Sequence, residues 1–580
     1  MKKLLRSAAW GVCLLAAWHL PAGADTRTIS TSGDFSAGSL VNVLVVAEGD
    51  GAVSMAPAAV PGAWQECTPL PTAVSHHAAV YYAGRIYCIG GRQGAGGEFL
   101  RDVYVSTLGP GGLPGSWTPT TPLPEGRAFH AAVAYNGYVY VVGGDKPGFE
   151  VTPEVLYARI ESDGQLGTWN STSPLPDEAG RDLAGLAVAY GRLYLVAGAP
   201  NGGFYGTDTV DSAPIRPDGS LGAWEEDRAL PADAARLGAP ALFASGRLYV
   251  VGGNAPILDS ADSPLNSVWM AEVTPDTKLG AWVTTNEIVV PIRDSQGNTV
   301  GSRQEPRFYT GNSSVAAGGH LVLVGGHAVA EGADQPAPVQ SVLVGRLLPN
   351  GDVDGWDYAS PYPFRVSRGA AVLAGDKVIV LGGRDSAGDE RADVYAAPLV
   401  PVTPQSVAPS GLYESAVLDL GVRSTVQSLQ WEASGNASVR LRYRLADESG
   451  VWGKWSAPSD ARSIPVLATA RYVQFAAEFT GDGKTSASLT SVGVTYTAEK
   501  PVVYGDITGD GQVTLADATA AAQIAVKSLE ATPEQVRAGD VAPKPGRGPR
   551  AGEAFGDGVV NILDVSRILR AALGLIQQLP

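Results

Sequence analysis

A short apolar strand that ends in two small residues recurs six times between residues 85 and 383. Successive copies are 53, 54, 55, 73 and 57 residues apart, and the long step contains an insertion near residues 286–306. A unit of this size cannot bury its apolar faces alone, so the repeat predicts stacked copies of one structural unit. The six copies end at Gly90-Gly91, Gly143-Gly144, Ala197-Gly198, Gly252-Gly253, Gly325-Gly326 and Gly382-Gly383.

Two further markers keep the same spacing. The tripeptide Pro-Leu-Pro begins at Pro69, Pro122 and Pro174. A tryptophan, usually after a small turn, stands at Trp64, Trp117, Trp169, Trp224, Trp282 and Trp356. Together with the diglycines, these markers resemble the kelch repeat, which implies that each repeat is a four-stranded blade of a β-propeller. In such a blade the diglycine lets the backbone turn, and the tryptophan fills the gap between neighbouring blades.

Six diglycines predict a six-bladed propeller over residues 61–402. The last diglycine is followed by one more strand, Ala392–Tyr395, but by no further tryptophan turn, whereas Trp64 precedes the first diglycine. The stretch 51–64 is therefore predicted to supply the outer strand of the final blade. Residues 25–60 are expected to be N-terminal strands that partly close this blade, and segment 34–55 pairs either with it or with the following domain.

Five arginines recur at similar places before the diglycines and form the candidate ligand site. Three lie 16 residues before a diglycine, one 18 and one 14. A ring of guanidiniums at the channel mouth would suit carboxylate or sulfate groups on a sugar. The alternative is that they are structural residues that bond loop carbonyls or an acid such as Asp182 or Glu305. The five are Arg127, Arg181, Arg236, Arg307 and Arg368.

No catalytic group can be read from the propeller sequence. His77 and His130 stand at the same place in adjacent repeats, thirteen residues before a diglycine, and are interpreted as repeat positions and not as a ligand pair. No Ser/His/Asp arrangement is evident, and carboxylate pairs for glycosidic cleavage cannot be assigned without geometry. The sequence favours a protein that is not an enzyme and leaves the question open.

Residues 403–498 have a different pattern. Apolar and charged side chains alternate over 439–444, which indicates a strand with arginines on one face. About seven such strands predict a β-sandwich that resembles the jelly-roll modules of secreted carbohydrate-active proteins. Trp452 and Trp455 are either a sugar-binding platform or packing residues of the core and edge.

A calcium-loop pattern begins at residue 506. Calcium needs six to eight oxygens around a sharply turned loop, with a glycine at position 6 and oxygen ligands at positions 1, 3, 5, 7, 9 and 12. Gly511 stands at position 6, and an apolar helical pattern follows the loop. The ligand positions hold Asp506, Thr508, Asp510, Gln512 through its carbonyl, Thr514 and Asp517.

A second, interrupted copy follows. Its loop is predicted to start at Asp540, to be broken by a Pro/Gly/Arg-rich insert at 542–555, and to continue through Asp557, Val559, Asn561 and Asp564. Two loop–helix units with Asp at position 12 resemble a type I dockerin domain, here over residues 502–580. The resemblance implies a Ca²⁺-dependent attachment to a cohesin-like module. Where many dockerins carry Ser-Thr, this chain has Leu515-Ala516 and Ile562-Leu563, which indicates either a different cohesin-like partner or packing on a neighbouring domain.

The N-terminal residues and the net charge indicate where the protein is located and which ligands it does not bind. Residues 1–24 read as a signal peptide, with a basic start, an apolar stretch and a small-residue cleavage site, so a secreted or cell-surface protein is expected. No later apolar run is long enough to predict a transmembrane segment. The net charge of −16 without a basic stretch argues against nucleic-acid binding. Cys67 and Cys88 could form a disulfide or remain buried thiols.

The fold class expected from these features is mainly β: a six-bladed kelch-like propeller, a β-sandwich and a small α-helical calcium-binding tail. The expected function is non-catalytic. The propeller binds a glycan or a protein, and the dockerin-like tail attaches the chain to a cohesin-like partner in an extracellular polysaccharide-processing assembly. The alternatives are a glycoside hydrolase, lyase or sugar epimerase with its site in the propeller channel, or a purely architectural surface protein.

Overall fold

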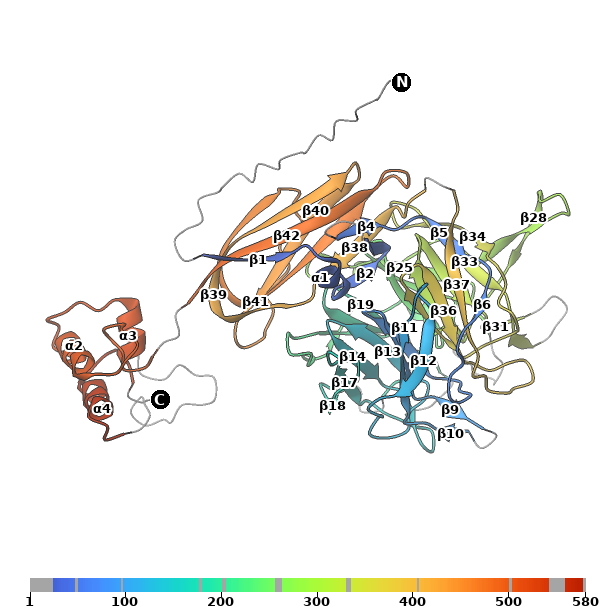
Figure 1. Cartoon of the computed structure of the whole chain (residues 1–580). Helices are drawn as coiled ribbons and strands as arrows, with labels where there is room; N and C mark the ends of the chain where they lie inside the picture. The colour runs from blue at the N-terminus through green and yellow to red at the C-terminus, as the bar shows by residue number, and fades with distance from the viewer. Residues whose placement is uncertain are drawn as a thin grey trace, which may run out of the picture. The chain divides into compact units, whose positions relative to one another are not determined.

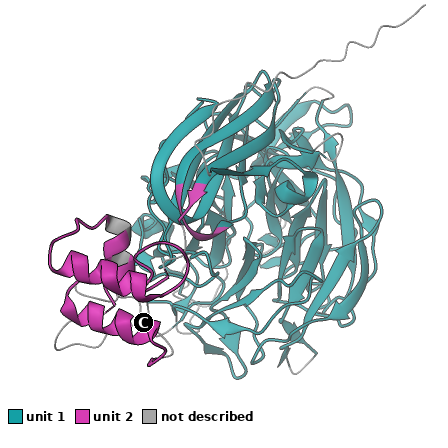
Figure 2. Ribbon diagram, turned by 60° about the vertical axis from the view of Figure 1, so that its left-hand side comes forward, with its two compact units in different colours: residues 1–419, 426–496 teal, residues 420–425, 497–580 magenta. Residues whose placement is uncertain are grey.

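The computed structural model describes residues 24–46, 51–94, 97–176, 180–200, 205–255, 263–329, 335–403, 406–499, 503–541 and 559–576. These residues are mainly β and separate into two compact units (Figure 2). The first unit comprises residues 1–419 and 426–496, and the second residues 420–425 and 497–580. In the described part of the chain, no helix is long and apolar enough to cross a membrane.

The described residues form six antiparallel blades, one for each diglycine repeat (Figure 1). Their first strands pack against one another in a closed ring that runs β7, β13, β19, β23, β29, β35 and back to β7. Blade 1 comprises β7 (Ala78–Tyr82), β8 (Arg85–Ile89), β11 (Val103–Leu108) and β12 (Pro114–Pro119). Blade 2 comprises β13 (Ala131–Tyr135), β14 (Tyr138–Val142), β17 (Val155–Arg159) and β18 (Asn170–Ser171). Blade 3 comprises β19 (Gly185–Ala189), β20 (Arg192–Val196), β21 (Val210–Pro214) and β22 (Glu225–Glu226). Blade 4 comprises β23 (Ala241–Ala244), β24 (Arg247–Val251), β25 (Val268–Glu272) and β26 (Val283–Thr284). Blade 5 comprises β29 (Ser314–Ala317), β30 (His320–Val324), β33 (Val342–Leu347) and β34 (Val353–Tyr358). Blade 6 comprises β35 (Ala370–Ala374), β36 (Lys377–Leu381) and β37 (Val394–Pro401), and it is completed by strands from the N-terminal side of the chain.

The last blade is completed by residues that precede the first. β5 (Ala59–Pro61) and β6 (Gln65–Glu66) both pair with β37 in antiparallel register. The ring is therefore closed by backbone hydrogen bonds between segments more than 300 residues apart in sequence, so separating the first and last blades requires breaking this pairing.

Each tryptophan of the repeat joins its blade to the preceding one. All six indole N–H groups donate a hydrogen bond to a backbone carbonyl of the neighbouring blade, at 2.7–3.1 Å. A buried indole needs such a partner, and the rest of its ring packs into the apolar space between the blades. The acceptors, in the order of the tryptophans from Trp64 to Trp356, are the carbonyls of Ser360, Thr68, Thr121, Ser173, Arg228 and Asn286.

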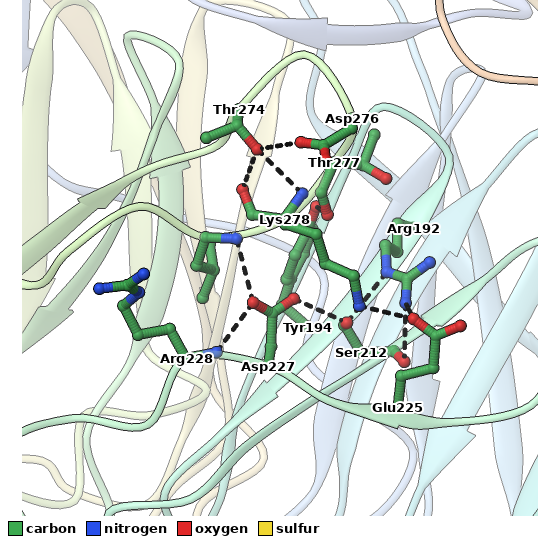
Figure 3. Close-up of polar contacts among 11 residues, drawn as sticks. Arg192, Tyr194, Ser212, Glu225, Asp227, Arg228, Thr274, Asp276, Thr277 and Lys278 are labelled. Atoms are coloured by element: carbon green, nitrogen blue, oxygen red, sulfur yellow. Dashed lines mark hydrogen bonds and ion pairs between the residues drawn. The ribbon is translucent and has the colours of Figure 1, made fainter.

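A second connection between blades uses side chains near their outer turns, as Figure 3 shows for blades 3 and 4. The Tyr194 hydroxyl donates to the Thr277 carbonyl at 2.8 Å, and Asp227 accepts the backbone N–H of Leu279 at 3.0 Å. Glu225 accepts from both Arg192 at 2.8 Å and Lys278 at 2.5 Å. The tyrosine contact recurs, because Tyr87, Tyr140 and Tyr249 donate to Gly164, Gly219 and Gly351 in the same way.

Short two-stranded ribbons extend from the blades. Three of them follow a diglycine, and the fourth is the insertion before blade 5, where β27 and β28 form an exposed hairpin. The ribbons are β9 (Arg92–Gln93) with β10 (Glu98–Phe99), β15 (Asp145–Lys146) with β16 (Glu150–Val151), β27 (Val289–Arg293) with β28 (Thr299–Gln304), and β31 (His327–Val329) with β32 (Pro336–Pro338).

The middle of the chain and its N-terminal strands share one nine-stranded sheet. The path is β2-β38-β41-β39-β42-β4-β3, with β1 beside β42 and β40 beside β41, and Figure 1 shows β1 in blue next to the later strands. Strands β1 to β4 thus lie in this sheet and not in the last blade, while the predicted sandwich stays a prediction. The bounds are β1 (Asp25–Ile29), α1 (Ser32–Ser36), β2 (Ser39–Val41), β3 (Val43–Val46), β4 (Ala52–Met55), β38 (Ser410–Glu414), β39 (Leu418–Gly435), β40 (Ser438–Ala446), β41 (Ser463–Thr480) and β42 (Ala487–Ala498).

A buried polar network attaches this sheet to blades 2 and 3. The Glu414 carboxylate accepts the Tyr135 hydroxyl and the Tyr190 backbone N–H, both at 2.7 Å. Arg444 donates to Gln474, whose amide donates to Tyr135 at 2.8 Å. Arg442 and Arg444 are therefore buried against the propeller, although the alternating pattern of β40 alone would place them on a solvated face.

Trp455 belongs to the same interface and is buried. Its indole N–H donates to the Tyr190 carbonyl at 2.9 Å, its ring meets the Tyr190 ring edge-on, and the Arg444 guanidinium lies 4.8 Å from its centroid. Arg444 also covers Trp452, at 4.3 Å. Of the two interpretations of these tryptophans, packing is the one that the structure favours.

Cys67 and Cys88 are both free thiols. Both belong to the apolar cluster between the last and first blades, Cys88 buried and Cys67 at its edge. Burial raises the pKa of Cys88 to about 12, so this thiol stays protonated at neutral pH.

The second unit is helical. It contains α2 (Leu515–Ala525), α3 (Pro533–Gly539) and α4 (Ile562–Ala572), with α2 packed against α4. Thr514 and Asp517 form a capping box at the start of α2, and Asn561 and Asp564 form the same box at the start of α4. Each loop–helix copy thus begins with the same local chemistry.

Candidate functional site

All six blades contribute to one cavity at the centre of the ring, which is open to solvent and has a volume of about 40 Å³. One residue from each blade reaches it from the same repeat position, two residues or more before the first strand. These six residues are His76, Phe129, Leu183, Gly238, Tyr309 and Arg368.

The backbone aims these residues inward. All six have a positive φ, between +48° and +65°, and five of them are not glycine. The N–H of Phe129 donates to the carbonyl of His76, and the same bond links Leu183 to Phe129, Gly238 to Leu183 and His76 to Arg368, at 2.8–3.1 Å. A left-handed backbone costs a non-glycine residue about 1–2 kcal/mol, and this series of four hydrogen bonds holds five of the six residues in place.

Asn312 crosses the centre of the ring. Blade 5 has two additional residues between the ring position and its diglycine, and they place Asn312 in the cavity lining. Its side-chain amide donates to the carbonyls of His77 at 3.0 Å and His130 at 3.1 Å, while its backbone carbonyl accepts the Ala371 N–H. The Asn312 side chain thus connects blade 5 to blades 1 and 2, its backbone connects blade 5 to blade 6, and the residue occupies part of the cavity.

Four of the five predicted arginines do not line this cavity. Arg127, Arg181, Arg236 and Arg307 are buried inside the blades. Arg127 pairs with Glu154, Arg181 with Asp211 at 2.9 Å and Arg307 with Glu305 at 2.6 Å. Arg236 donates to the carbonyls of Ala234 and Gly252, both at 2.7 Å. The predicted ring of five guanidiniums is not formed, and only Arg368 reaches the cavity.

The spacing of these buried arginines has a backbone cause. The carbonyls of Arg127, Arg181, Arg236 and Arg307 each accept the N–H of the second small residue of the preceding diglycine, at 2.7–3.0 Å. The approach is close: a Cβ added at Gly143 would lie 2.1 Å from the Arg181 oxygen. The arginine and the diglycine therefore recur together because they meet between blades.

Two further arginines, which the sequence analysis missed, lie near Arg368. Arg92 and Arg384 each follow a diglycine directly, in blades 1 and 6, and both are partly exposed. The backbone brings both toward Arg368: Arg92 bridges to Ser75, Arg384 bridges to Ser367, and the N–H of His76, which follows Ser75, donates to the Arg368 carbonyl at 2.9 Å. Burial lowers the pKa of Arg92, and the charges of Arg384 and Arg368 lower it further. The position after the diglycine is the sequence signal that could have identified them.

Aromatic rings surround these cations. Arg92 lies 4.9–5.7 Å from the ring centroids of Phe99, Phe129 and Phe149, and Arg368 lies 4.4 Å from that of Tyr309. Phe149 is 55% exposed. A guanidinium held over aromatic faces keeps its hydrogen-bonding edge available for a planar anion.

The histidines of this region are uncharged at neutral pH. Burial lowers the pKa of His77 to about 4 and that of His130 to about 3. Burial, together with Arg368, Arg92 and Arg384, lowers the pKa of His76 well below its usual value. Among the described residues, no group of three potential metal ligands includes these histidines.

A pair of buried carboxyl groups lies directly behind the cavity ring. Asp182 precedes Leu183, and Asp145 bridges to Ala128, the residue before Phe129. Burial raises the pKa of both carboxyl groups, and the charge of Asp145 raises that of Asp182 further, to about 8. The uncharged form of Asp182 is therefore favoured near neutral pH.

We expect Asp182→Asn to stabilise the protein at alkaline pH. A folded-state pKa above the unfolded value means that the folded form binds more protons, so wild-type stability is greatest at low pH and falls as pH rises from about 4 to about 8. Melting temperatures of the variant and wild type should therefore converge near pH 4 and separate by pH 8.5. The exposed Asp460→Asn is the control, and a gap that does not grow with pH would contradict the assignment.

In the second unit the structure brings three of the predicted metal ligands together. Asp506, Asp510 and Asp517 each offer one carboxylate oxygen, and these oxygens lie within 4.8 Å of one another. Gly509 and Gly511 have positive φ, which turns the loop around the Asp506 carboxylate. Thr508 donates to Asp517 at 2.8 Å, and the Gln512 side chain is exposed. Oxygen ligands of this kind fit a hard cation such as Ca²⁺.

Only part of the second loop lies among the described residues. Asp540 and Asp564 are buried, and Asp564 accepts the N–H groups of Val541 at 2.7 Å and Asn561 at 2.9 Å. Val559 is exposed, and Asp557 lies outside the described residues. The first loop is therefore the copy whose predicted ligands can be compared with a metal site.

Curated proteins resemble the chain over part of its length. Kelch-like protein 40 of Xenopus laevis is 25% identical over 210 residues, which are 36% of this chain and 31% of that protein. Beta-scruin of Limulus polyphemus is 30% identical over 139 residues, 23% of this chain and 14% of the other. Kelch-like protein terF of Aspergillus terreus is 24% identical over 244 residues, 41% and 50% of the two chains. The chain thus spans half or less of these relatives.

Two other comparisons complete these findings. No protein-family model matches the chain. A solved structure titled "Structure of YjhT" aligns with a TM-score of 0.43 and 13% identity over 57% of this chain and 95% of the other.

Proposed function

Because the first unit contains a six-bladed propeller of kelch repeats, we propose that the protein binds a glycan or a protein ligand at the mouth of the propeller channel. The observation that carries the proposal is the central cavity, to which all six blades contribute a residue. Concave sites that join apolar and aromatic walls to a few polar groups are where ligands most often bind. Arg368, His76 and Asn312 are the polar groups here, and Phe129, Leu183 and Tyr309 the apolar ones.

The second unit is proposed to be a dockerin-like docking domain that depends on Ca²⁺. The carboxylate cluster of Asp506, Asp510 and Asp517 supports the metal, because three like charges this close favour a bound cation. The residues at positions 10 and 11 of each copy support the docking role. Leu515 is 55% exposed, and Ile562 and Leu563 are 70% and 55% exposed, so these apolar side chains are available to a cohesin-like partner.

The proposed setting is extracellular. The signal peptide predicted over residues 1–24 lies, but for its last residue, outside the described residues, so the support comes from its sequence. In this setting the propeller would present a ligand to a polysaccharide-processing assembly, and the tail would hold the chain there.

The full chain tests the propeller proposal. It is run on native gels that contain acidic or neutral polysaccharides, in calcium buffer, while the same mixtures are assayed for new reducing or unsaturated ends. We expect retardation by at least one polysaccharide and no new ends. Absence of retardation, together with no binding of surface-protein candidates, would contradict the proposal.

A carbohydrate-active enzyme is the second candidate, and the carboxyl pair Asp145 and Asp182 is the observation that favours it. A carboxyl group with a pKa near neutrality can exchange a proton with a substrate. Both groups are buried behind the ring, which is why binding is the leading proposal. New polysaccharide ends that Asp182→Asn abolishes would reverse this order.

A further inference from the structure

We infer that the channel mouth is an anion-binding site in which Arg92, Arg368 and Arg384 hold the carboxylate or sulfate group of an acidic sugar. The inference rests on the proposed ligand-binding function and names the chemical class of the ligand. These three arginines differ from the five that were predicted from the sequence, and only Arg368 belongs to both sets.

The first argument is the contrast between two groups of arginines. Arg127, Arg181 and Arg307 are buried and each pairs with a carboxylate. Among the described residues, neither Arg92 nor Arg368 forms an ion pair, and Arg384 is 3.9 Å from Glu390 at the limit of one. Arg92 donates to the Gly97 carbonyl at 3.4 Å, a long bond that leaves most of its guanidinium donors unused.

The second argument is the charge of the site. Blades 1 and 6 are neighbours in the ring, and they place three cations at one side of the mouth in a chain whose net charge is −16. Asp145 and Glu390 are the carboxylates that raise the pKa of Arg92, and burial raises the pKa of Asp145, which favours its uncharged form. Like charges this close disfavour the folded state unless an anion lies between them.

The third argument selects a sugar. Phe149 presents an exposed ring next to Arg92, and the half-buried Tyr309 lines the cavity next to Arg368. An apolar face beside a guanidinium suits a ligand with one flat apolar side and one anionic group, and a sugar ring with a carboxylate has both. Asn312 obstructs the channel below, so the cavity accommodates a sugar unit and not a chain threaded through the propeller.

The test compares two sugars that differ only in the charged group. Galacturonate and galactose are titrated into the full chain by calorimetry, at low and high sodium chloride. We expect wild type to bind galacturonate at least tenfold more tightly than galactose, with an affinity that falls with salt. The double variant Arg92→Gln with Arg368→Gln should lose at least tenfold for galacturonate and keep its affinity for galactose.

The control is Arg228→Gln, which removes an exposed arginine at an outer turn of blade 3 (Figure 3). Its affinities should equal those of wild type, and melting curves establish that each variant is folded. Equal binding of the two sugars, or an undiminished preference in the double variant, would overturn the inference while leaving the binding proposal standing. Binding of polyglutamate in preference to polygalacturonate would overturn the choice of a sugar. No binding of any of these ligands would instead count against the proposed function.

Discussion

Replacing Asp506 and Asp517 together by alanine is expected to abolish calcium binding by the first loop and to unfold that loop. Asp517 is fully buried and accepts hydrogen bonds from the backbone N–H and the hydroxyl of both Thr508 and Thr514, at 2.8–2.9 Å. Asp506 accepts the N–H groups of Gly509 and Gly511, both at 2.7 Å. The variant therefore loses two of the proposed metal ligands, together with the hydrogen bonds that turn the loop and cap α2.

The measurement is a calcium titration followed by circular dichroism with and without a chelator. Wild type should gain helical signal on adding calcium, because binding and folding of such loops are coupled. Asp482→Ala is the matched control, since Asp482 also accepts two backbone N–H groups but lies in the turn between β41 and β42, away from the calcium loop in sequence. An unchanged calcium affinity in the double variant would refute the metal assignment.

Trp455→Ala is expected to lower the free energy of unfolding of the first unit by about 3–5 kcal/mol, the usual cost of removing a buried tryptophan. The substitution leaves a cavity beside Tyr190, removes the hydrogen bond to its carbonyl and uncovers the Arg444 guanidinium. Because these contacts join the sheet to blade 3, we also expect the two parts to unfold in separate transitions.

Denaturant unfolding followed by tryptophan fluorescence and circular dichroism measures this effect. Val451→Ala, at a side chain that is 64% exposed, should change stability by less than about 0.5 kcal/mol. A loss below about 1 kcal/mol in Trp455→Ala, with one unfolding transition, would show that the network around Glu414 holds the interface without the indole.

The repeat was sufficient to predict the propeller, because its markers are the residues that join the blades. The tryptophans donate to the neighbouring blade, and the diglycines allow the backbone approach that a Cβ would prevent. The six-bladed count follows from the same markers. These features are local to each repeat, so a pattern in the sequence is enough to reveal them.

The candidate site could be predicted only in part. The spacing of Arg127, Arg181 and Arg236 is real, but it reflects backbone pairing with the diglycines and not a common direction of the guanidiniums. The acidic partners of two of them, Glu154 for Arg127 and Asp211 for Arg181, are 27 and 30 residues further along the chain, and no sequence pattern links them. Arg92 and Arg384 were overlooked because a single residue after a turn carries no periodic signal.

The contacts between the nine-stranded sheet and the propeller could not be predicted from the sequence either. The alternation in β40 indicates a strand, but it cannot tell a solvated face from one that packs on another domain. Arg442 and Arg444 lie on a buried face, where Glu478 and Gln474 pair with them. The same holds for the N-terminal strands: β1 and β4 pair with β42, β2 pairs with β38, and β3 pairs with β4.

The central claim is that the ligand binds in the cavity at the centre of the propeller. Its most direct test measures how the variant Gly238→Leu binds the polysaccharide that retards the wild-type chain on native gels. Gly238 is the one ring position without a side chain, and a Cβ there makes only ordinary contacts, the nearest at 3.5 Å, while Leu183 occupies the same left-handed position in blade 3. The variant should fold and fill the cavity. Gly246→Leu places the same side chain on a left-handed turn in open space and serves as the control. We expect Gly238→Leu to lose binding and Gly246→Leu to keep it; equal binding by both would place the ligand elsewhere on the protein.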